Sequence, residues 1–520
     1  MKWVLYKIRK LSNGLFLTEK IFNMKRILFI AALFQVVTSV NSQEISDALR
    51  YAQTNQTGTA RFRAMGGAFG SLGGDLSSIM SNPAGSVVFL NNQVAVTASV
   101  FAQNNTSNYF GSANKQNTSN LDVNQAGGVF VFENKNPESG WKKFALGINY
   151  ENMSNFNTKQ FSSGINNQNS AVQYFANYAN GIPNIDLQNL FYEEFGFGGQ
   201  QAYLAYQTFL INPVNNVDSN ILYLPNTFAT GNFYQENQTV TSGYNGKLAF
   251  NASTQYKDKL FLGINLNSHF SDFTKSTSFY EDYQDATNAD ITKGIQSFRF
   301  DNDLYTYGTG FSFQLGAIAK VTESFRLGLA YQSPTWMRLN DELTQGLSST
   351  CADCPQPSYN ENPGITNIYA PYKLQTPSTV TGSLSYIFGK KGLISFDYTS
   401  KSYQNTKFRS AGFTTLNADM NTILKRTNEF RIGAEQRIKQ WSLRGGYHFD
   451  ESPYKDTNLM GDLTGYSAGL GYNFGATKLD LAYTYTKRNT FEQFFPQGMT
   501  DRAFINGVNN TFTVTLGFEL

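Results

Sequence analysis

The chain ends in the stretch Thr511-Phe-Thr-Val-Thr-Leu-Gly-Phe-Glu-Leu520, in which polar and apolar side chains alternate strictly. One face of this stretch collects the large apolar side chains, namely Phe512, Val514, Leu516, Phe518 and Leu520. A period of two is typical of a β-strand with one apolar and one polar side. The C-terminus therefore predicts a strand that faces an apolar environment on one side.

The same alternation recurs along most of the chain. We identify fourteen candidate strands, at residues 92–102, 121–133, 142–152, 243–256, 259–270, 310–320, 324–332, 378–388, 392–399, 428–438, 441–449, 464–474, 477–487 and 511–520. Their apolar faces often end in Tyr, Phe or Trp, which is the aromatic girdle of a band that faces lipid. A soluble sandwich shows similar alternation, so one strand decides nothing, whereas fourteen in one chain favour a barrel.

The connections between these strands alternate in length without exception. Every connection from an odd to an even strand has between 14 and 90 residues, and every connection from an even to an odd strand has between 2 and 8. Transmembrane barrels have short periplasmic turns and long outer loops. We therefore predict an all-β fold, a 14-stranded antiparallel transmembrane β-barrel in the outer membrane, with both barrel ends in the periplasm.

Composition agrees with this fold class and excludes several functions. Charged residues make up 15% of the 520 residues, against a usual quarter, and aromatic residues make up another 15%. So many aromatic residues exclude a disordered chain. The mean hydropathy of −0.36 excludes a bundle of membrane helices. A net charge of +3 gives no reason to expect a nucleic-acid partner.

The first 42 residues predict export from the cytoplasm. Residues 24–42 combine a basic start, an apolar core at 27–34 and a small residue, Ser42, at a plausible cleavage point. Residues 1–23 then form an upstream extension, and Met24 is the expected true start; a long basic region before the apolar core is the alternative. The residue directly after the cleavage point is not a cysteine, which excludes a lipoprotein. The mature protein is expected to begin at Gln43.

The two cysteines, Cys351 and Cys354, lie three residues apart. This spacing supplies half of a zinc site, but only His269 and His448 are available as imidazole ligands. We therefore expect no metal and no cofactor, and interpret the pair as a loop disulfide in an oxidising compartment. Two ordinary histidines and no reliable Gly-x-Ser-x-Gly motif also argue against an enzyme.

Residues 43–91 lack strand alternation and precede the barrel at 92–520. They contain the run Met65-Gly-Gly-Ala-Phe-Gly-Ser-Leu-Gly-Gly-Asp75, followed by Ser81-Asn-Pro-Ala-Gly85. A phosphate-binding loop would need a following Lys-Ser/Thr and a βαβ unit, and both are missing. Small residues let backbones pack closely, so we predict a hatch, or plug, in a lumen that would otherwise be a wide aqueous hole.

The segment Arg61 to Gly85 resembles the FadL/TodX-type outer-membrane transporters of hydrophobic compounds, most of all the branch common in Bacteroidetes-type bacteria. Residues 326–336, 374–377 and 386–398 agree with this resemblance. The family fold is a 14-stranded barrel with an N-terminal hatch, which matches the strand count above.

The resemblance implies passive inward transport of long-chain fatty acids or aromatic hydrocarbons. Substrate would pass from the outer loops to an apolar pocket in the barrel, and would leave sideways into outer-membrane lipid at a kink in the third strand, here residues 142–152. The motif associated with that kink corresponds to Asn82, Pro83 and Ala84, although Asn-Pro also favours an ordinary turn. We expect a monomer.

Other residues leave alternatives open. Arg431 and Arg444 fall on the lumen face, where either could bind a ligand carboxylate; salt bridges to Glu435 or Asp480 are the preferred interpretation. An aromatic group in the longest loop (Phe191, Tyr192, Phe195 and Phe197) suits loop packing better than ligand contact.

Two other transport roles use a similar barrel. The first is a type IX secretion shuttle, a FadL-like barrel that binds exported proteins through its outer loops, and the loop 153–242 is compatible with it. The second is a diffusion porin, which a lumen lined by charges would favour.

Overall fold

The computed structural model describes residues 43–227, 231–283 and 292–520. The predicted upstream extension and signal peptide, residues 1–42, lie outside this described part. Among the described helices, none is both long and apolar enough to cross a membrane.

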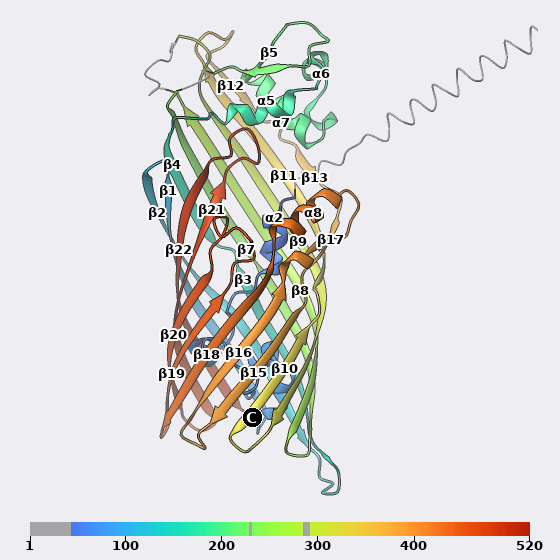
Figure 1. The fold of residues 1–520 in the computed structure, drawn as a ribbon, viewed down its shortest axis with the longest axis vertical. Helices are drawn as coiled ribbons and strands as arrows, with labels where there is room; N and C mark the ends of the chain where they lie inside the picture. The colour runs from blue at the N-terminus through green and yellow to red at the C-terminus, as the bar shows by residue number, and fades with distance from the viewer. Residues whose placement is uncertain (1–42, 228–230, 284–291) are drawn as a thin grey trace, which may run out of the picture. The chain divides into compact units, whose positions relative to one another are not determined.

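In the described residues, fourteen antiparallel strands form the closed wall of a barrel (Figure 1), as the sequence predicted. The barrel closes because the first wall strand pairs with the last, from Gln93 opposite Glu519 to Asn108 opposite Phe504. In chain order the wall strands are β1 (Gln93–Tyr109), β2 (Ser112–Glu133), β3 (Trp141–Asn155), β7 (Phe233–Tyr256), β8 (Leu260–Asp282), β9 (Ile295–Lys320), β10 (Phe325–Gln332), β15 (Thr379–Ile387), β16 (Gly392–Ser402), β18 (Arg426–Ile438), β19 (Trp441–Asp450), β20 (Leu463–Asn473), β21 (Thr477–Gln493) and β22 (Arg502–Glu519).

Each predicted strand overlaps one wall strand, and the two faces of the wall differ as predicted. In β22, the outward Phe512 is 56% exposed, whereas the neighbouring Thr513 is 1% exposed and points to the lumen. The same outward exposure of apolar side chains occurs around the barrel, for example at Leu146, Ile264, Leu315, Leu329, Ile394, Ile432 and Leu481. These side chains form the apolar band that a bilayer would cover.

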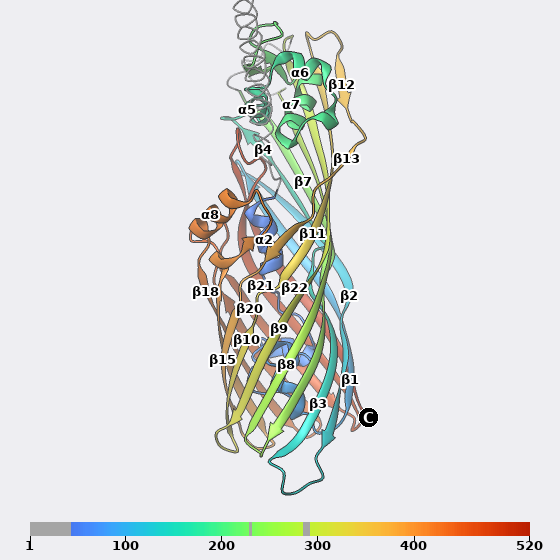
Figure 2. The same ribbon diagram turned by 90° about the vertical axis from the view of Figure 1, so that its right-hand side faces the viewer.

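The hatch occupies the lumen of the barrel, and its helices are visible between the strands in Figure 2. It comprises α2 (Ile45–Ala52), α3 (Ala60–Ala64), α4 (Ser78–Ser81) and the 3-10 helix η1 (Pro83–Val88). Glycines bring hatch and wall into backbone contact. A Cβ atom at Gly433 would collide with the carbonyl oxygen of Met65, and one at Gly446 would collide with the amide nitrogen of Gly66.

The outer end of the barrel carries most of the remaining elements, as Figure 1 shows. The long loop after the third strand contains β4 (Thr158–Asn166), α5 (Val172–Ala179), α6 (Asn184–Asn189), η2 (Tyr192–Glu194), α7 (Phe197–Gln207), β5 (Ile211–Pro213) and β6 (Tyr223–Pro225). The later outer loops contain β11 (Trp336–Cys351), β12 (Ser358–Glu361), β13 (Thr366–Ile368), β14 (Tyr372–Gln375), η3 (Tyr403–Asn405), β17 (Lys407–Phe408) and α8 (Thr414–Ile423). Helices α5 to α7 pack with the outer ends of β8 and β9 in one aromatic-rich cluster, which we call the cap.

Candidate functional site

The third strand of the wall is interrupted. It runs as β3 to Asn155, breaks at residues 156–157 and continues as β4. Both parts pair with β7, and the register shifts between Asn152 and Ser154. The sequence could not show whether this strand is kinked, and the structure places an irregularity at residues 152–157.

The backbone pairing between β2 and the third strand ends just before this irregularity. The backbone ladder runs from Glu133 opposite Lys143 to Gln125 opposite Glu151 and goes no further. Above that point, no main-chain ladder joins β2 to β3 or β4 in the described residues. We call this boundary, between residues 112–124 of β2 and residues 152–166 of the third strand, the seam.

The hydrogen bonds that cross the seam involve side chains and form no backbone ladder. Asn152 donates to the Asp122 carboxylate at 2.5 Å, and Asn120 donates to the carbonyl oxygen of Asn157 at 3.2 Å. Strand β4 contacts β2 through side chains, such as Asn114, which donates to Ser163 at 3.1 Å, and it also contacts the lumen face of β1, where the hydroxyls of Ser107 and Ser162 are 2.6 Å apart. Because side-chain contacts are easier to exchange than a continuous ladder, the wall is expected to open more easily at the seam than within its intact ladders.

A segment of the hatch, residues 53–58, crosses the lumen beside the seam, and we call it the linker. On the seam side, Asn55 donates to Ser154 at 3.3 Å and Thr57 donates to Glu151 at 2.5 Å. On the opposite side, Lys401 donates to the carbonyl oxygen of Ala52 at the start of the linker. The linker therefore ties the irregular third strand to the far wall.

Two small cavities flank the linker. One, of about 110 Å³, is bounded by charged side chains that include Glu151, Lys247, Asp397, Lys401, Glu429 and Arg431. The other, of about 140 Å³, touches the seam at Asn155 and Asn157 and is also bounded by Arg63 and His448. The resemblance implied an apolar pocket inside the barrel, but these two cavities are lined by a mixture of charged, polar and apolar side chains. The physical reason is that the lumen faces of the strands carry charges and amides.

Arg63 of the hatch borders the second cavity, and no sequence motif predicted a role for it. Its side chain is buried, and its Nε and Nη1 atoms have no hydrogen-bond partner in the described residues. Burial lowers the pKa of this hatch arginine to about 10, and the nearby Glu151 carboxylate opposes that shift. The guanidinium lies 5.4 Å from the centre of the Phe101 ring, and its unused donors beside a cavity are suited to bind an anion.

The Asn82-Pro83-Ala84 motif lies against the wall strands after the third. The Asn82 side-chain amide donates to the carbonyl oxygens of Gly70, at 2.7 Å, and of Ala317 in β9, at 3.1 Å. The carbonyl oxygen of Pro83 accepts from Asn251 of β7 at 2.9 Å. The motif thus fixes the hatch to β7 and β9 below the seam, and its gating role stays a prediction.

The two predicted lumen arginines have different surroundings. Arg444 donates to Glu435 at 2.8 Å and to Asp480 at 2.6 Å, which is the pairing preferred from the sequence. Glu435 also binds Arg61 of the hatch at 2.8 Å. Arg431 bounds the cavity beside the linker and donates to Glu429 at 3.2 Å, while its buried Nε has no partner in the described residues. Arg444 also borders a cavity, of about 270 Å³, so a ligand-binding role for either arginine stays a prediction.

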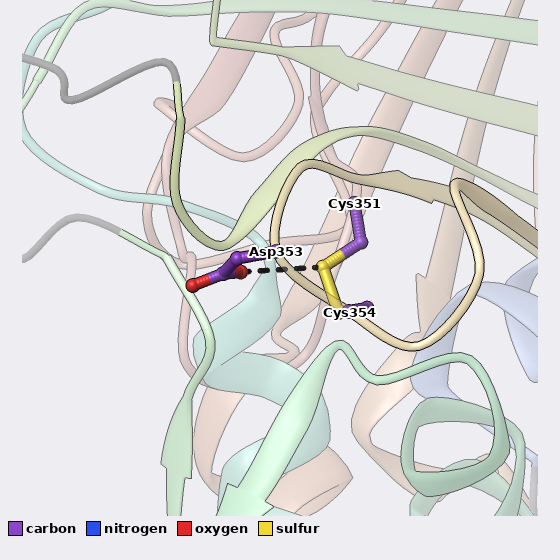
Figure 3. Close-up of side chains that lie close together, drawn as sticks. All are labelled: Cys351, Asp353 and Cys354. Carbon is purple, nitrogen blue, oxygen red and sulfur yellow. Dashed lines mark hydrogen bonds between the residues drawn. A yellow bond between two sulfur atoms is a disulfide. The ribbon is translucent and has the colours of Figure 1, made fainter.

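Cys351 and Cys354 form a disulfide in an outer loop, with the Asp353 carboxylate 3.7 Å from the Cys351 sulfur (Figure 3). These three residues are the one group in the described residues whose ligand atoms lie close enough to share a metal ion. Sulfurs joined in a disulfide offer no thiolate to a metal. Of the two histidines considered as zinc ligands, His269 lies in the lumen, where its Nε2 atom is 2.8 Å from the hydroxyl oxygen of Ser312.

The aromatic residues of the long loop mostly pack within the cap. Tyr192 is buried and its hydroxyl donates to Gln345 at 3.2 Å, while the ring of Phe195 lies 6.0 Å from that of Tyr203. Phe197 packs edge to face against Tyr178. Phe191 is exposed.

Comparisons with known proteins identify a matching sequence family and solved structures with a similar fold. The family model for "Outer membrane protein transport protein (OMPP1/FadL/TodX)" matches residues 212–507, more than half of the chain. Among solved structures, a FadL homologue of Pseudomonas aeruginosa is similar at 13% identity and a TM-score of 0.53, over 90% of this chain and 99% of that chain. The Pseudomonas putida toluene transporter TodX has 14% identity and a TM-score of 0.49, over 90% of this chain and 100% of that chain. No curated protein matches the sequence.

Proposed function

The chain belongs to the OMPP1/FadL/TodX family of outer-membrane transport proteins for hydrophobic compounds, and we propose that it takes up long-chain fatty acids or other hydrophobic molecules by passive diffusion sideways through the seam. The observation that carries this proposal is the end of the β2–β3 ladder at Gln125 and Glu151. A molecule that leaves there enters the bilayer without returning its hydrocarbon to water. Each methylene kept out of water is worth about 0.8 kcal/mol.

Transport requires the linker to move. Ligand pockets usually measure about 300–1,000 Å³, and the cavities beside the linker measure about 110 and 140 Å³. The linker bonds to Ser154 and Glu151, on the third strand itself. Displacing the linker would therefore enlarge the cavities and release the strand at the same time.

The charged side chains of these cavities suit the head of a substrate. Arg63 and Arg431 both have buried nitrogen atoms without a partner in the described residues. Either guanidinium could hold a carboxylate while the chain enters the bilayer through the seam. In this proposal, Asn82, Pro83 and Ala84 gate the path by holding the hatch against β7 and β9.

A reversible disulfide across the seam tests the route. Asp122 and Asn152 face each other there with side chains in hydrogen-bond contact. We would make Asp122→Cys/Asn152→Cys in a Cys351→Ser/Cys354→Ser background and measure uptake of radiolabelled oleate and toluene by proteoliposomes. Oxidation should lower the initial rate at least tenfold, and a reductant should restore it.

The matched control is Ala126→Cys/Tyr150→Cys, a pair that lies opposite within the intact ladder of the same two strands. Its oxidation should leave uptake unchanged. Uptake that persists with the seam closed would show that substrate leaves elsewhere. If the unmodified barrel moves neither compound but binds the C-terminal signal of an exported protein, the protein-handling role replaces this proposal.

A further inference from the structure

The largest described cavity lies away from the seam, at the periplasmic end of the barrel. It has a volume of about 620 Å³ and lies between hatch residues 72–91 and the ends of the wall strands beside the short turns. We call it the vestibule. Its volume falls within the range of about 300–1,000 Å³ that is usual for ligand sites, whereas the cavities beside the linker are several times smaller.

Cations line one side of the vestibule. Lys143, Lys320 and Arg326 reach it from the lumen faces of β3, β9 and β10. In the described part of the chain, none of the three forms an ion pair with a carboxylate. The other three cations of the vestibule are paired, Arg61 and Arg437 with Glu435 and Lys478 with Glu519.

The three unpaired cations are held by weaker partners. Lys143 donates to the carbonyl oxygen of Phe89 at 2.7 Å, and Arg326 donates to that of Leu72 at 3.0 Å. The Nε of Arg326 is buried and has no hydrogen-bond partner in the described residues. The Lys320 ammonium lies 5.1 Å from the centre of the Phe261 ring. Six cationic side chains but only two carboxylates, Glu133 and Glu519, are among the described residues that line the vestibule, and this excess of positive charge favours the binding of an anion.

Apolar side chains line the cavity beside these cations. They come from the hatch and from three strands, and include Leu72, Val87, Phe89, Phe261 and Leu393. A small inorganic anion would leave this surface exposed to water, and an alkane would leave the cations unpaired. A molecule with an anionic head and a hydrocarbon chain satisfies both surfaces.

We propose that the vestibule is a binding site for an amphipathic anion, whose carboxylate or phosphate binds Lys143, Lys320 and Arg326 and whose chain packs on Phe89 and Phe261. Two sources supply this chemistry, a free fatty acid and a phospholipid of the periplasmic leaflet. An anion that binds here competes with the carbonyl oxygens of Phe89 and Leu72 for Lys143 and Arg326. Occupancy of the vestibule therefore loosens two contacts between hatch and wall.

Photolabelling tests the site without requiring transport, so a failed uptake assay leaves the result interpretable. The purified barrel in an uncharged detergent is irradiated with a diazirine analogue of dodecanoate, and labelled peptides are mapped by mass spectrometry. The peptides that contain residues 72–89 and Phe261 should be labelled. The diazirine analogue of dodecanol, with the same chain and no charge, should label them at least tenfold less.

Charge variants make the test specific. Lys320→Glu should lower labelling by dodecanoate at least tenfold, because Lys320 contacts no hatch carbonyl and its loss leaves the hatch attached. The control Lys407→Glu makes the same charge change at an exposed residue of the outer loops and should label normally. For the unmodified protein, ~1 M NaCl screens charges beyond about 3 Å and should also reduce labelling, even if Lys320→Glu fails to fold.

A diazirine phosphatidylglycerol identifies the source. Labelling by this lipid at equal or lower concentration assigns the site to membrane phospholipid, and labelling by dodecanoate alone assigns it to free fatty acid. Equal labelling by dodecanoate and dodecanol, or labelling by dodecanoate that Lys320→Glu and high salt leave unchanged, would overturn the proposal.

Discussion

The side-chain amide of Asn82 donates a hydrogen bond of 2.7 Å to the carbonyl oxygen of Gly70. This bond connects the two glycine-containing segments of the hatch, residues 65–75 and 81–85. The same amide reaches Ala317 of the wall at 3.1 Å, and its oxygen accepts from the amide of Ala84 at 3.1 Å. One buried side chain thereby joins the hatch to itself and to the barrel.

Asn82→Ala should loosen the hatch while leaving the barrel intact. Each buried group left without a partner costs about 1–3 kcal/mol, and the substitution removes partners from Gly70, Ala84 and Ala317. Hydrogen exchange of residues 70–88 should accelerate, and conductance in planar bilayers should rise. Asn91→Ala, which removes an exposed bond to Glu519, should change neither. Unchanged exchange in Asn82→Ala would show that the motif is an ordinary turn.

Glu435 should be the most sensitive ionic position of the barrel. Its side chain is fully buried and binds Arg61, Arg437 and Arg444. Removing one partner from a buried ion pair costs about 3–5 kcal/mol, so Glu435→Gln should unfold at a clearly lower temperature in a heat-modifiability gel. Arg437→Gln, whose side chain is 47% exposed, should cost less than about 1 kcal/mol. Equal losses in the two variants would contradict the central role of Glu435.

The sequence predicts the wall well because lipid and lumen impose opposite demands on alternate residues. The prediction weakens where those demands end. Strand β7 begins at Phe233 rather than at 243, because its outer part lies beyond the apolar band and both faces carry polar residues. The pairing of Arg444 with Glu435 and Asp480 could be predicted, since all three share the lumen face of nearby strands.

The parts of the site that depend on the hatch could not be predicted in the same way. The partner that Arg61 finds in Glu435, 374 positions later, depends on how the hatch is oriented in the lumen. The seam depends on where a ladder stops, and no local pattern marks that point. Glu151 does not mark it either, because carboxylates also stand within other wall strands, as at Asp397, Glu435 and Asp480.

The disulfide between Cys351 and Cys354 should contribute little to stability or transport. It closes a loop of only four residues, for which the chain-entropy relation gives roughly 2 kcal/mol at most. Cys351→Ser/Cys354→Ser should therefore fold, retain uptake within about twofold and lower the heat-modifiability midpoint only slightly. Loss of uptake in this variant, with normal assembly, would instead place the outer loop on the substrate path.

Substitution of Arg63 should have opposite effects on the stability of the protein and on its uptake of oleate. Its guanidinium is buried beside the seam without hydrogen bonds to Nε or Nη1 in the described residues, and burying unpaired polar groups is unfavourable by about 1–3 kcal/mol. Arg63→Met keeps much of the side-chain length and removes the charge. We expect it to raise the unfolding free energy by about that amount and to lower oleate uptake at least fivefold, while toluene uptake stays unchanged because toluene has no carboxylate to bind.

Arg63→Lys is the matched control, because it keeps a cation at the same cavity and should retain most oleate uptake. The comparison distinguishes two roles for the buried charge. If Arg63 serves only the structure, through its attraction to Glu151, then Arg63→Met will be less stable and will lose oleate and toluene uptake together. If Arg63 holds the substrate head, stability and oleate uptake will change in opposite directions, since the unfavourable burial of the charge is then retained for binding.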